Sequence, residues 1–389
     1  MLTPGNICLS TESDSRRERE LPFLSVVIPV RNEESHIGAV LDDLETQDYP
    51  HDRIEVLVAD GNSIDGTVNV VKAFARQTSL SVRLLLNPAQ LSSSGRNVGA
   101  RNARGAYLIF IDGHCHIPSN TLLTDAVDLF EKTRSDCLCR PQPLTMLGNS
   151  DFQEVVAHVR STVLGHGRDS TIYATDLEGF VNPCSSGALY RSTVFERVGY
   201  YDESFDACED VEFNYRVFKA GLSSYFSPLL AVLYQPRTGL TCLWQQMIRY
   251  GRGRFRLIQK HPETFSLSQV VPAGFLVWLV IGGMTSSFWW RFAACFFGTL
   301  IVYLSVVLGF SSALGFRYGW RHILQAPAVY VVTHFGLGAG FLSELFVAGL
   351  GGRRCSNNFV DCASPFPCST SKTKISTGKS AHRRWVRSG

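Results

Sequence analysis

The stretch Phe23-Leu-Ser-Val-Val-Ile-Pro-Val30 is a short run of apolar and β-branched residues, which predicts a buried β-strand. Residues 33–47 follow it with apolar side chains at helical spacing. The same alternation continues, with further strands predicted at 54–59, 82–86 and 107–111 and helices at 67–77 and 92–103. Strands that alternate with helices form a mostly parallel sheet with helices on both faces. The sequence therefore predicts an α/β fold.

Acidic residues follow two of these predicted strands. Asp60 comes directly after strand 54–59 and Asp112 directly after strand 107–111, while Pro29 lies near the end of the first strand. In open parallel sheets, ligands bind beyond the carboxyl ends of the strands. We therefore expect a ligand site that includes both carboxylates.

The composition excludes several classes of protein. The 389 residues include 37 Lys+Arg and 34 Asp+Glu, so the chain lacks the basic excess of a dedicated nucleic-acid binder. Its 25 Phe, 13 Tyr and 6 Trp exclude disorder throughout. Only 18 % of the residues are charged, against about 25 % in soluble domains. Part of the chain is therefore expected to lie in an apolar environment such as a membrane, where a charged side chain is energetically unfavourable.

Long apolar runs gather near the C-terminus. Residues 270–290 and 292–316 contain no charged side chain, and each run is long enough to span a bilayer as a helix. The alternative is a pair of buried helices in a large soluble core, but a separation of only one residue, Arg291, favours membrane helices. The third run, 323–350, includes one histidine, one glutamate and several glycines. It is either a packed spanning helix or a re-entrant segment.

Basic residues flank the apolar region on both sides. Arg252, Arg254 and Arg256 precede it and are expected to reach anionic lipid headgroups, and the tail 351–389 is also basic. Positive residues favour the cytoplasmic side, so an even number of crossings or a re-entrant third segment is expected. Residues 1–21 lack the apolar stretch of a secretory signal and read as a disordered lead. These features predict a multi-pass protein of the inner (cytoplasmic) membrane, with a cytoplasmic N-terminal domain, contacts with membrane lipids and a flexible tail.

Five motifs together resemble family 2 glycosyltransferases with the GT-A nucleotide-sugar-binding fold. They are Val27-Ile-Pro-Val-Arg-Asn-Glu-Glu34, Val58-Ala-Asp-Gly-Asn-Ser-Ile-Asp-Gly-Thr67, Phe110-Ile-Asp-Gly-His114, Cys208-Glu-Asp210 and Gln246-Met-Ile-Arg-Tyr250. The Asp-Gly-His and Arg-Tyr-Gly-Arg-Gly-Arg sequences resemble bacterial exopolysaccharide enzymes of the succinoglycan type. The resemblance implies a nucleotide-sugar half at 22–117, an acceptor half at 118–265 and a membrane region at 266–350.

This resemblance also implies an activity. The chain would transfer a sugar from a nucleotide-diphosphate sugar, UDP-linked by family expectation, to a polyprenyl-diphosphate-linked saccharide, with inversion at the anomeric carbon. Such a reaction belongs to cell-surface or exopolysaccharide synthesis. Two alternatives stay open: a non-catalytic membrane component that retains a nucleotide-sugar-binding domain, and a processive synthase whose helices form a channel.

The resemblance implies a divalent cation, Mg²⁺ or Mn²⁺, at the end of strand 107–111. Asp112 would anchor the ion, and His114 occupies the position where the family usually has a second aspartate. The alternative for Asp112 is a helix cap ahead of Pro118. For His116, a solvated loop histidine is the preferred interpretation.

The donor residues implied by the resemblance lie in the first half of the chain. Asp60 would bind the nucleotide, and Pro29 and Glu33 would shape the first turn after a strand. Glu33 could instead simply favour the dipole of the following helix. Arg96 could reach the diphosphate or form a surface salt bridge, and Asn97 lies beside it.

The acceptor half carries the implied catalytic residues. Asp210 is the candidate base, and Glu209 would hold the acceptor or cap the helix. The alternative for this pair is two acids in the first turn of helix 209–220. Arg249 would assist the leaving diphosphate, and Gln246 and Tyr250 would contact the substrate, with Tyr250 in place of the family's usual tryptophan.

Overall fold

The computed structural model describes residues 21–144, 150–167 and 171–350, so residues 1–20 of the predicted lead and the predicted tail lie outside the described residues. The strands are β1 (Leu24–Val30), β2 (Ile54–Asp60), β3 (Ser81–Leu86), β4 (Tyr107–Phe110), β5 (Cys115–His116), β6 (Cys137–Cys139), β7 (Gly179–Phe180), β8 (Gly187–Arg191), β9 (Ser224–Phe226) and β10 (Leu233–Tyr234). The helices are α2 (Ile37–Glu45), α3 (Thr67–Phe74), α4 (Ser92–Asn102), α5 (Leu122–Thr133), α6 (Asp151–Arg160), α7 (Val163–His166), α8 (Ser192–Val198), α9 (Glu209–Lys219), α10 (Leu240–Lys260), α11 (Leu267–Ser286), α12 (Trp290–Tyr318) and α13 (Arg321–Gly349).

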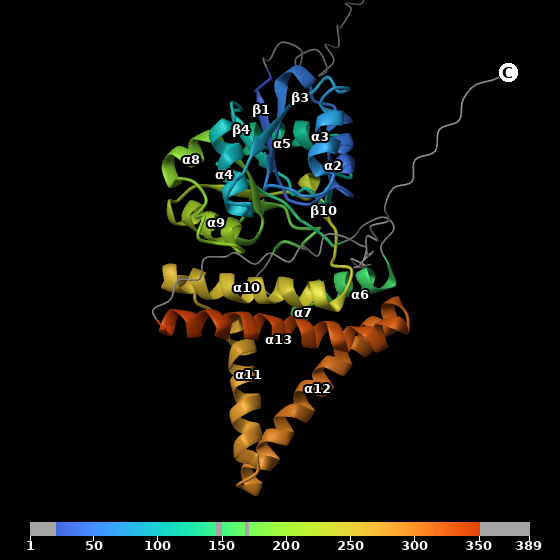
Figure 1. Cartoon of the computed structure of the whole chain (residues 1–389), viewed down its shortest axis with the longest axis vertical. Coiled ribbons are helices and arrows are strands. Elements are labelled where there is room, and N and C mark those ends of the chain that lie inside the picture. The colour runs from blue at the N-terminus through green and yellow to red at the C-terminus, as the bar shows by residue number, and fades with distance from the viewer. Residues whose placement is uncertain (1–20, 145–149, 168–170, 351–389) are drawn as a thin grey trace, which may run out of the picture.

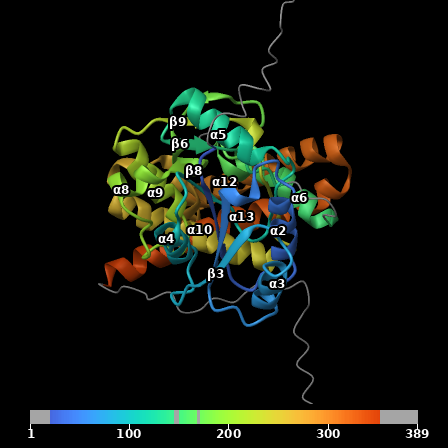
Figure 2. The ribbon, with the colours of Figure 1, turned by 90° about the horizontal axis from the view of Figure 1, so that it is seen from above.

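Within the described residues, one sheet of eight strands has the order β3-β2-β1-β4-β8-β6-β9-β7. The strands β1 to β4 are parallel, and β8 is antiparallel to both β4 and β6. The predicted α/β fold is confirmed, as a mixed sheet with helices packed around it (Figures 1 and 2). Because β6 therefore runs in the same direction as β4, the carboxyl ends of β1, β2, β4 and β6 lie at one edge of the sheet. This edge carries the predicted ligand site.

The long helices α10 and α13 lie side by side beneath the α/β domain, and α11 and α12 form a hairpin that points away from it (Figure 1). Glycine allows the close approach of α10 and α13. A methyl group at Gly251 would overlap the carbonyl oxygen of Leu337, and one at Gly340 would overlap the carbonyl oxygen of Ile248. Larger side chains at these two positions would force the helices apart.

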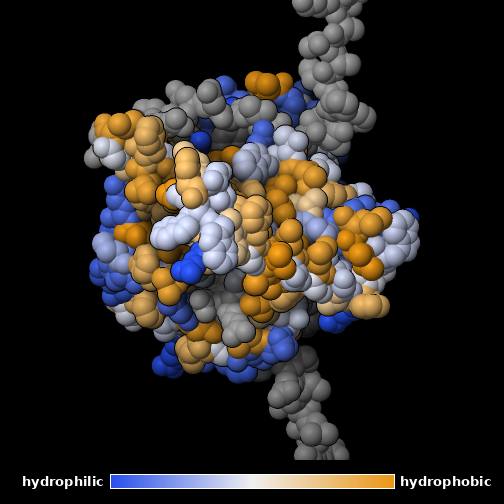
Figure 3. All heavy atoms as spheres, turned by 90° about the horizontal axis from the view of Figure 1, so that it is seen from below, coloured by the Kyte–Doolittle hydropathy of each residue, from blue (hydrophilic) through white to orange (hydrophobic). Residues whose placement is uncertain are grey.

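Three helices, α11, α12 and α13, are long and apolar enough to cross a membrane. In α11 and α12 only 11 % of the most apolar window is buried within the protein, against 33 % in α13. The chain reverses at residues 287–289, so Arg291 lies in the first turn of α12 rather than between the helices. Viewed from the end of the hairpin, apolar residues cover much of this face and hydrophilic residues surround it (Figure 3).

The acceptor half and the membrane region share a hydrophobic core, in which α13 crosses the direction of α11 and α12 and lies against α6 and α10 (Figure 1). The buried members of this core come from α6, α10, α12 and α13: Val155, Val156, Val159, Leu243, Met247, Val307, Leu314, Ala326, Val329 and Tyr330. The third apolar run is therefore part of a platform that supports the α/β domain.

Candidate functional site

Arg96, on α4, joins the two halves of the predicted site. Its Nη2 donates to Asp112 Oδ1 at 2.7 Å, and its Nε lies 3.7 Å from Glu209 Oε1. The guanidinium also lies over the rings of Phe110 and Tyr201, at 5.7 and 5.8 Å from their centroids. The Arg96 side chain is 12 % exposed and that of Asp112 is 26 % exposed, so the salt bridge among the alternatives is present but is partly buried within the predicted site.

The acidic pair begins α9, directly after Cys208. Asp210 Oδ1 accepts a hydrogen bond from the backbone N–H of Val211 at 2.8 Å, so this acid does contribute to the first turn of the helix. Burial and the adjacent Asp210 carboxylate raise the pKa of Glu209, and the Arg96 guanidinium opposes that rise. Each acid therefore has a distinct environment, with Glu209 more buried and bridged to Arg96.

Glu33 and His114 form a second pair at the same edge of the sheet. Glu33 Oε1 lies 2.8 Å from His114 Nδ1, and Glu33 Oε2 lies 3.2 Å from His36 Nδ1. Burial acts to raise the pKa of Glu33, but the two histidines outweigh it and bring this pKa down to about 2. The Glu33 carboxylate therefore orients the imidazole rings of His114 and His36.

The other ring nitrogen of His114, Nε2, is buried and has no hydrogen-bond partner among the residues that the structure describes. A carboxylate that accepts from Nδ1 leaves the lone pair of Nε2 available to a metal ion, an arrangement common around metal-binding histidines. Asp112 and His114 therefore fit a divalent cation that takes its other ligands from a bound diphosphate. In residues 21–144, 150–167 and 171–350, no group of three or more His, Cys, Asp or Glu side chains gathers into a complete protein cage.

The helix-cap alternative for Asp112 is wrong, and so is the preferred interpretation of His116 as a solvated loop histidine. The Asp112 carboxylate pairs with Arg96, and the next helix, α5, has Thr121 at its N-cap, so Asp112 caps no helix. His116 lies in β5 instead of a solvated loop, and its Nδ1 is 2.8 Å from Asp43 Oδ2. This second His–carboxylate pair lies two residues from His114 in the sequence.

Asp60 and Pro29 lie on adjacent strands, as the sequence predicts. Asp60 is the last residue of β2, is 6 % exposed, and accepts from the backbone N–H of Ser63 at 3.2 and 3.3 Å. Pro29 packs against Gly95, where an added Cβ would come within 3.0 Å of the Pro29 Cβ. This contact brings α4 close to β1 and so places Arg96 at the edge of the sheet.

Asn97 contacts a loop of the acceptor half. Its Nδ2 donates to the Tyr201 carbonyl at 2.9 Å and to Glu203 Oε1 at 2.7 Å, while its Oδ1 accepts from the Tyr201 N–H at 2.8 Å. The amide is buried and fully used by these bonds. Asn97 therefore fixes the loop ahead of the acidic pair, and a direct contact with substrate is not what its geometry favours.

The predicted motif on α10 faces the same loop. Gln246 Nε2 donates to Tyr250 Oη at 3.2 Å, one helical turn away. Arg249 Nη2 donates to the carbonyl oxygen of Asp206 at 2.7 Å. In this structure Arg249 therefore holds the segment that leads into Glu209 and Asp210.

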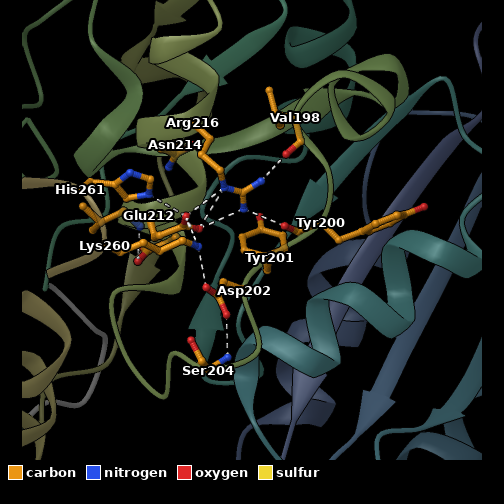
Figure 4. Close-up of polar contacts among 12 residues, drawn as sticks. Val198, Tyr200, Tyr201, Asp202, Ser204, Glu212, Asn214, Arg216, Lys260 and His261 are labelled. Atoms are coloured by element: carbon orange, nitrogen blue, oxygen red, sulfur yellow. Dashed lines mark hydrogen bonds and ion pairs between the residues drawn. The ribbon is translucent and has the colours of Figure 1, made fainter. Parts of the chain in front are cut away.

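A buried ion network that was not predicted from the sequence connects α9 to the end of α10 (Figure 4). The Glu212 side chain is fully buried and lies 3.0 Å from Arg216 Nη2, 2.8 Å from Lys260 Nζ and 3.0 Å from His261 Nε2. Burial acts to raise the pKa of Glu212, but these three donors lower it overall. The spacing of Glu212 and Arg216, four residues apart on one helix, was the available signal.

Arg256 and Arg140 are two further cations whose positions the sequence did not predict. Arg256 was expected at the lipid surface, which is wrong: its Nη1 lies 2.9 Å from Asp206 Oδ1 and its Nε 2.8 Å from Glu344 Oε1 on α13. These two ion pairs hold the guanidinium against Asp206 and Glu344 within the protein. Arg140 follows β6, is 4 % exposed and donates to the Phe110 carbonyl at 2.9 Å. A charged residue directly after a strand was the missed signal for Arg140.

Comparisons with known proteins agree with this geometry. Residues 25–199 match the family model "Glycosyl transferase family 2". The chain is 32 % identical to the succinoglycan biosynthesis protein ExoA of Rhizobium meliloti, over 82 % of this chain and 94 % of that protein. It is 26 % identical to a dolichyl N-acetyl-alpha-D-glucosaminyl phosphate 3-beta-D-2,3-diacetamido-2,3-dideoxy-beta-D-glucuronosyltransferase of Methanococcus voltae, over 66 % of this chain and 80 % of that protein.

A solved structure shares the fold. The mannosyltransferase PcManGT from Pyrobaculum calidifontis, in complex with GDP-Man and Mn²⁺, superimposes with a TM-score of 0.57 at 18 % identity, over 84 % of this chain and 87 % of that one. The sheet-edge acids, the acidic pair and the relatives together lead to one conclusion: this chain belongs to glycosyl transferase family 2.

Proposed function

We propose that the chain transfers a sugar from a nucleotide-diphosphate sugar, with UDP as the expected nucleotide, to a lipid-linked saccharide, with inversion at the anomeric carbon. The observation that carries this proposal is the Arg96 bridge between Asp112 and Glu209. Through this bridge, the end of β4, where Asp112 would hold the cation, lies beside the acidic pair that begins α9. A leaving diphosphate and an attacking hydroxyl need such neighbouring groups.

The proposed roles follow from the chemistry of the side chains. Asp210 takes the proton of the acceptor hydroxyl, and Glu209 holds that hydroxyl for attack from the side opposite the leaving group. Arg249 and Arg96 offer guanidinium N–H groups to the departing diphosphate, and Asp60 accepts from the nucleotide. Gln246 and Tyr250 line the acceptor side.

Asp112 and His114 would hold a Mg²⁺ or Mn²⁺ ion. When bound, the cation spreads the negative charge that develops on the diphosphate. The free Nε2 of His114 favours Mn²⁺ over Mg²⁺, since imidazole nitrogen suits Mn²⁺ better than the harder ion. The Mn²⁺ in the PcManGT complex supports this choice.

A lipid-linked acceptor, within cell-surface or exopolysaccharide synthesis, is supported by the relatives and by the membrane helices. The names of the two relatives refer to succinoglycan biosynthesis and to a dolichyl-phosphate-linked sugar. Anchoring an enzyme beside a lipid-borne acceptor raises their effective concentration. The same anchoring explains why α10, which carries part of the site, packs directly on α13.

The experiment measures incorporation of label from a panel of radiolabelled nucleotide sugars into lipid-extractable material. Membranes that contain the full chain should incorporate label, and membranes with Asp210→Asn should not. Binding of a nucleotide sugar without transfer from any donor would instead support the alternative, a non-catalytic component of polysaccharide assembly.

Substitution of Arg96 is expected to move the pH dependence of transfer. Arg96 opposes the raised pKa of Glu209, so Arg96→Met should raise that pKa further. The carboxylate would then be lost at higher pH, and the acidic limb of the rate profile should shift to higher pH. The matched control is Arg101→Met on the exposed side of the same helix, which should leave the profile in place. An unshifted profile in Arg96→Met would remove Glu209 from the reaction.

We propose further that only α11 and α12 cross the inner membrane and that α13 lies along its cytoplasmic face. The ion pair between Glu344 of α13 and Arg256 of α10 supports this placement, because it holds the C-terminal part of the third apolar run against α10, beneath the α/β domain. Two crossings also return the basic tail to the cytoplasm.

Reporter fusions test this topology. Green fluorescent protein fused after residue 350 should fluoresce, and alkaline phosphatase at the same point should be inactive. Phosphatase inserted after residue 288, in the turn between α11 and α12, should be active. An active phosphatase after residue 350 would show that α13 crosses the membrane as a third span.

A further inference from the structure

Arg160, the last residue of α6, is a buried cation without an acidic partner. It is 6 % exposed, and its Nε has no hydrogen-bond partner in the described part of the chain. Its Nη1 donates to Met247 Sδ at 3.5 Å, and its Nη2 lies 3.3 Å from His166 Nδ1. The guanidinium also lies 5.9 Å from the centroid of the Tyr250 ring. A sulfur atom, a neutral imidazole and a ring face do not balance a full positive charge.

Further positive charge surrounds this position. Burial and then the charges of Arg160 and Arg254 lower the pKa of His166 to about 3, so the imidazole stays neutral beside two guanidinium groups. Burial raises the pKa of Tyr250, while Arg160 and Arg237 oppose that rise. Arg160 has no carboxylate within ion-pair distance among the residues that the structure describes, whereas the charges acting on Arg237 come first from Tyr234 and also from the Glu33 carboxylate. Taking such charges out of water is costly unless a counter-ion joins them.

The cluster lies where the α/β domain meets the membrane platform. The valines of α6 pack into the core shared with α10, α12 and α13. Thr162 Oγ1 lies 3.0 Å from Tyr330 Oη, and His334 Nε2 lies 2.9 Å from the Leu164 carbonyl oxygen, so α6 and α7 are fixed to α13. Figure 1 shows α6 at one end of α10, above α13. The position suits an anion at headgroup depth, whereas Asp60 and Asp112 lie at the sheet edge.

We propose that Arg160, with the Tyr250 ring beside it, binds the diphosphate of the lipid-linked acceptor. The inference rests on the proposed function and names where the acceptor's headgroup is held. Guanidinium groups match diphosphate oxygens by paired N–H donors, and several cations suit an anion with more than one charge. Tyr250 then links the anchored diphosphate to the acceptor motif, so the saccharide extends toward Asp210.

The test uses the full chain in nanodiscs and measures binding of two probes, farnesyl diphosphate and UDP, by calorimetry. Arg160→Met should weaken farnesyl diphosphate binding at least tenfold and leave UDP binding within twofold. Arg160→Lys, which keeps the charge but loses the paired N–H donors, should recover only part of the affinity. The matched control is Arg317→Met, an exposed arginine at the end of α12, which should change neither affinity.

Thermal unfolding separates ligand binding from a purely structural role. Arg160→Met removes an uncompensated charge from an apolar setting, so the midpoint should stay level or rise by about 2 °C. A clear fall in the midpoint of both Arg160 variants would identify a structural cation and overturn the inference. Equal loss of UDP and farnesyl diphosphate would assign Arg160 to the donor, and unchanged binding of both would exclude an anion site.

Failure of this inference is distinguishable from failure of the proposed function. Wild-type chain that binds UDP and incorporates label, but binds no farnesyl diphosphate beyond empty nanodiscs, would overturn the diphosphate site alone. Absence of transfer from every nucleotide sugar would instead remove the proposed activity.

Discussion

Asparagine in place of Asp210 is expected to lower the rate of sugar transfer by about 10³-fold, with little change in donor affinity. The amide keeps the size of the side chain and can still accept from the Val211 N–H, but it cannot take a proton from the acceptor hydroxyl. General-base catalysis contributes about 10²–10⁴-fold to enzyme rates. The measurement is initial incorporation of label at saturating donor and the Kd for UDP.

The matched control is Asp128→Asn, an exposed acid on α5, which should retain the wild-type rate. Because Glu209 is the adjacent acid, Glu209→Gln completes the comparison. Full activity in Asp210→Asn with loss in Glu209→Gln would move the base to Glu209. Equal activity in all variants would leave neither acid as the base.

Removal of the divalent cation is expected to abolish transfer, and Mn²⁺ should restore it. Asp112→Asn should lower the rate by more than about 10²-fold, since it loses the charge that anchors the ion and frees Arg96. His114→Gln and Glu33→Gln should each raise the Mn²⁺ concentration at half-maximal activity by about 10- to 100-fold. Glu33 acts there only through the His114 ring that it orients at 2.8 Å.

His116→Gln is the matched control for these substitutions. His116 also pairs with a carboxylate at 2.8 Å, yet it lies outside the proposed site, so its loss should leave the Mn²⁺ requirement unchanged. A direct titration of Mn²⁺ by electron paramagnetic resonance gives a second readout that is independent of turnover. Full activity after exhaustive chelation would contradict the cation assignment.

The positions of the acidic site residues could be predicted from the local sequence. Asp60 and Asp112 follow apolar runs that are buried strands in the structure, and parallel strands bring their carboxyl ends to one edge whatever the loops between them do. The acidic pair at the start of α9 is equally local, because its position depends on where the helix begins.

Ion pairs between residues that are far apart in the chain could not be predicted from the sequence. The sequence favoured a diphosphate contact and a salt bridge of Arg96 equally, because the residues around Arg96 in the chain do not identify Asp112 or Glu209 as its partners. Arg256 looked like its basic neighbours, and only the packing of α10 shows that it lies between Asp206 and Glu344.

In the charge-poor region, residues 267–349, some properties follow from the sequence alone and others depend on the tertiary structure. The sequence by itself determined that three helices of residues 267–349 are apolar enough to enter a membrane, since hydropathy and length are properties of each segment alone. Only the tertiary structure decided that α13 lies along α10, because glycines on both helices permit a contact that hydropathy does not record. It also decided that Arg160 is buried with no carboxylate beside it among the residues that the structure describes, since the partners of a side chain depend on the whole fold.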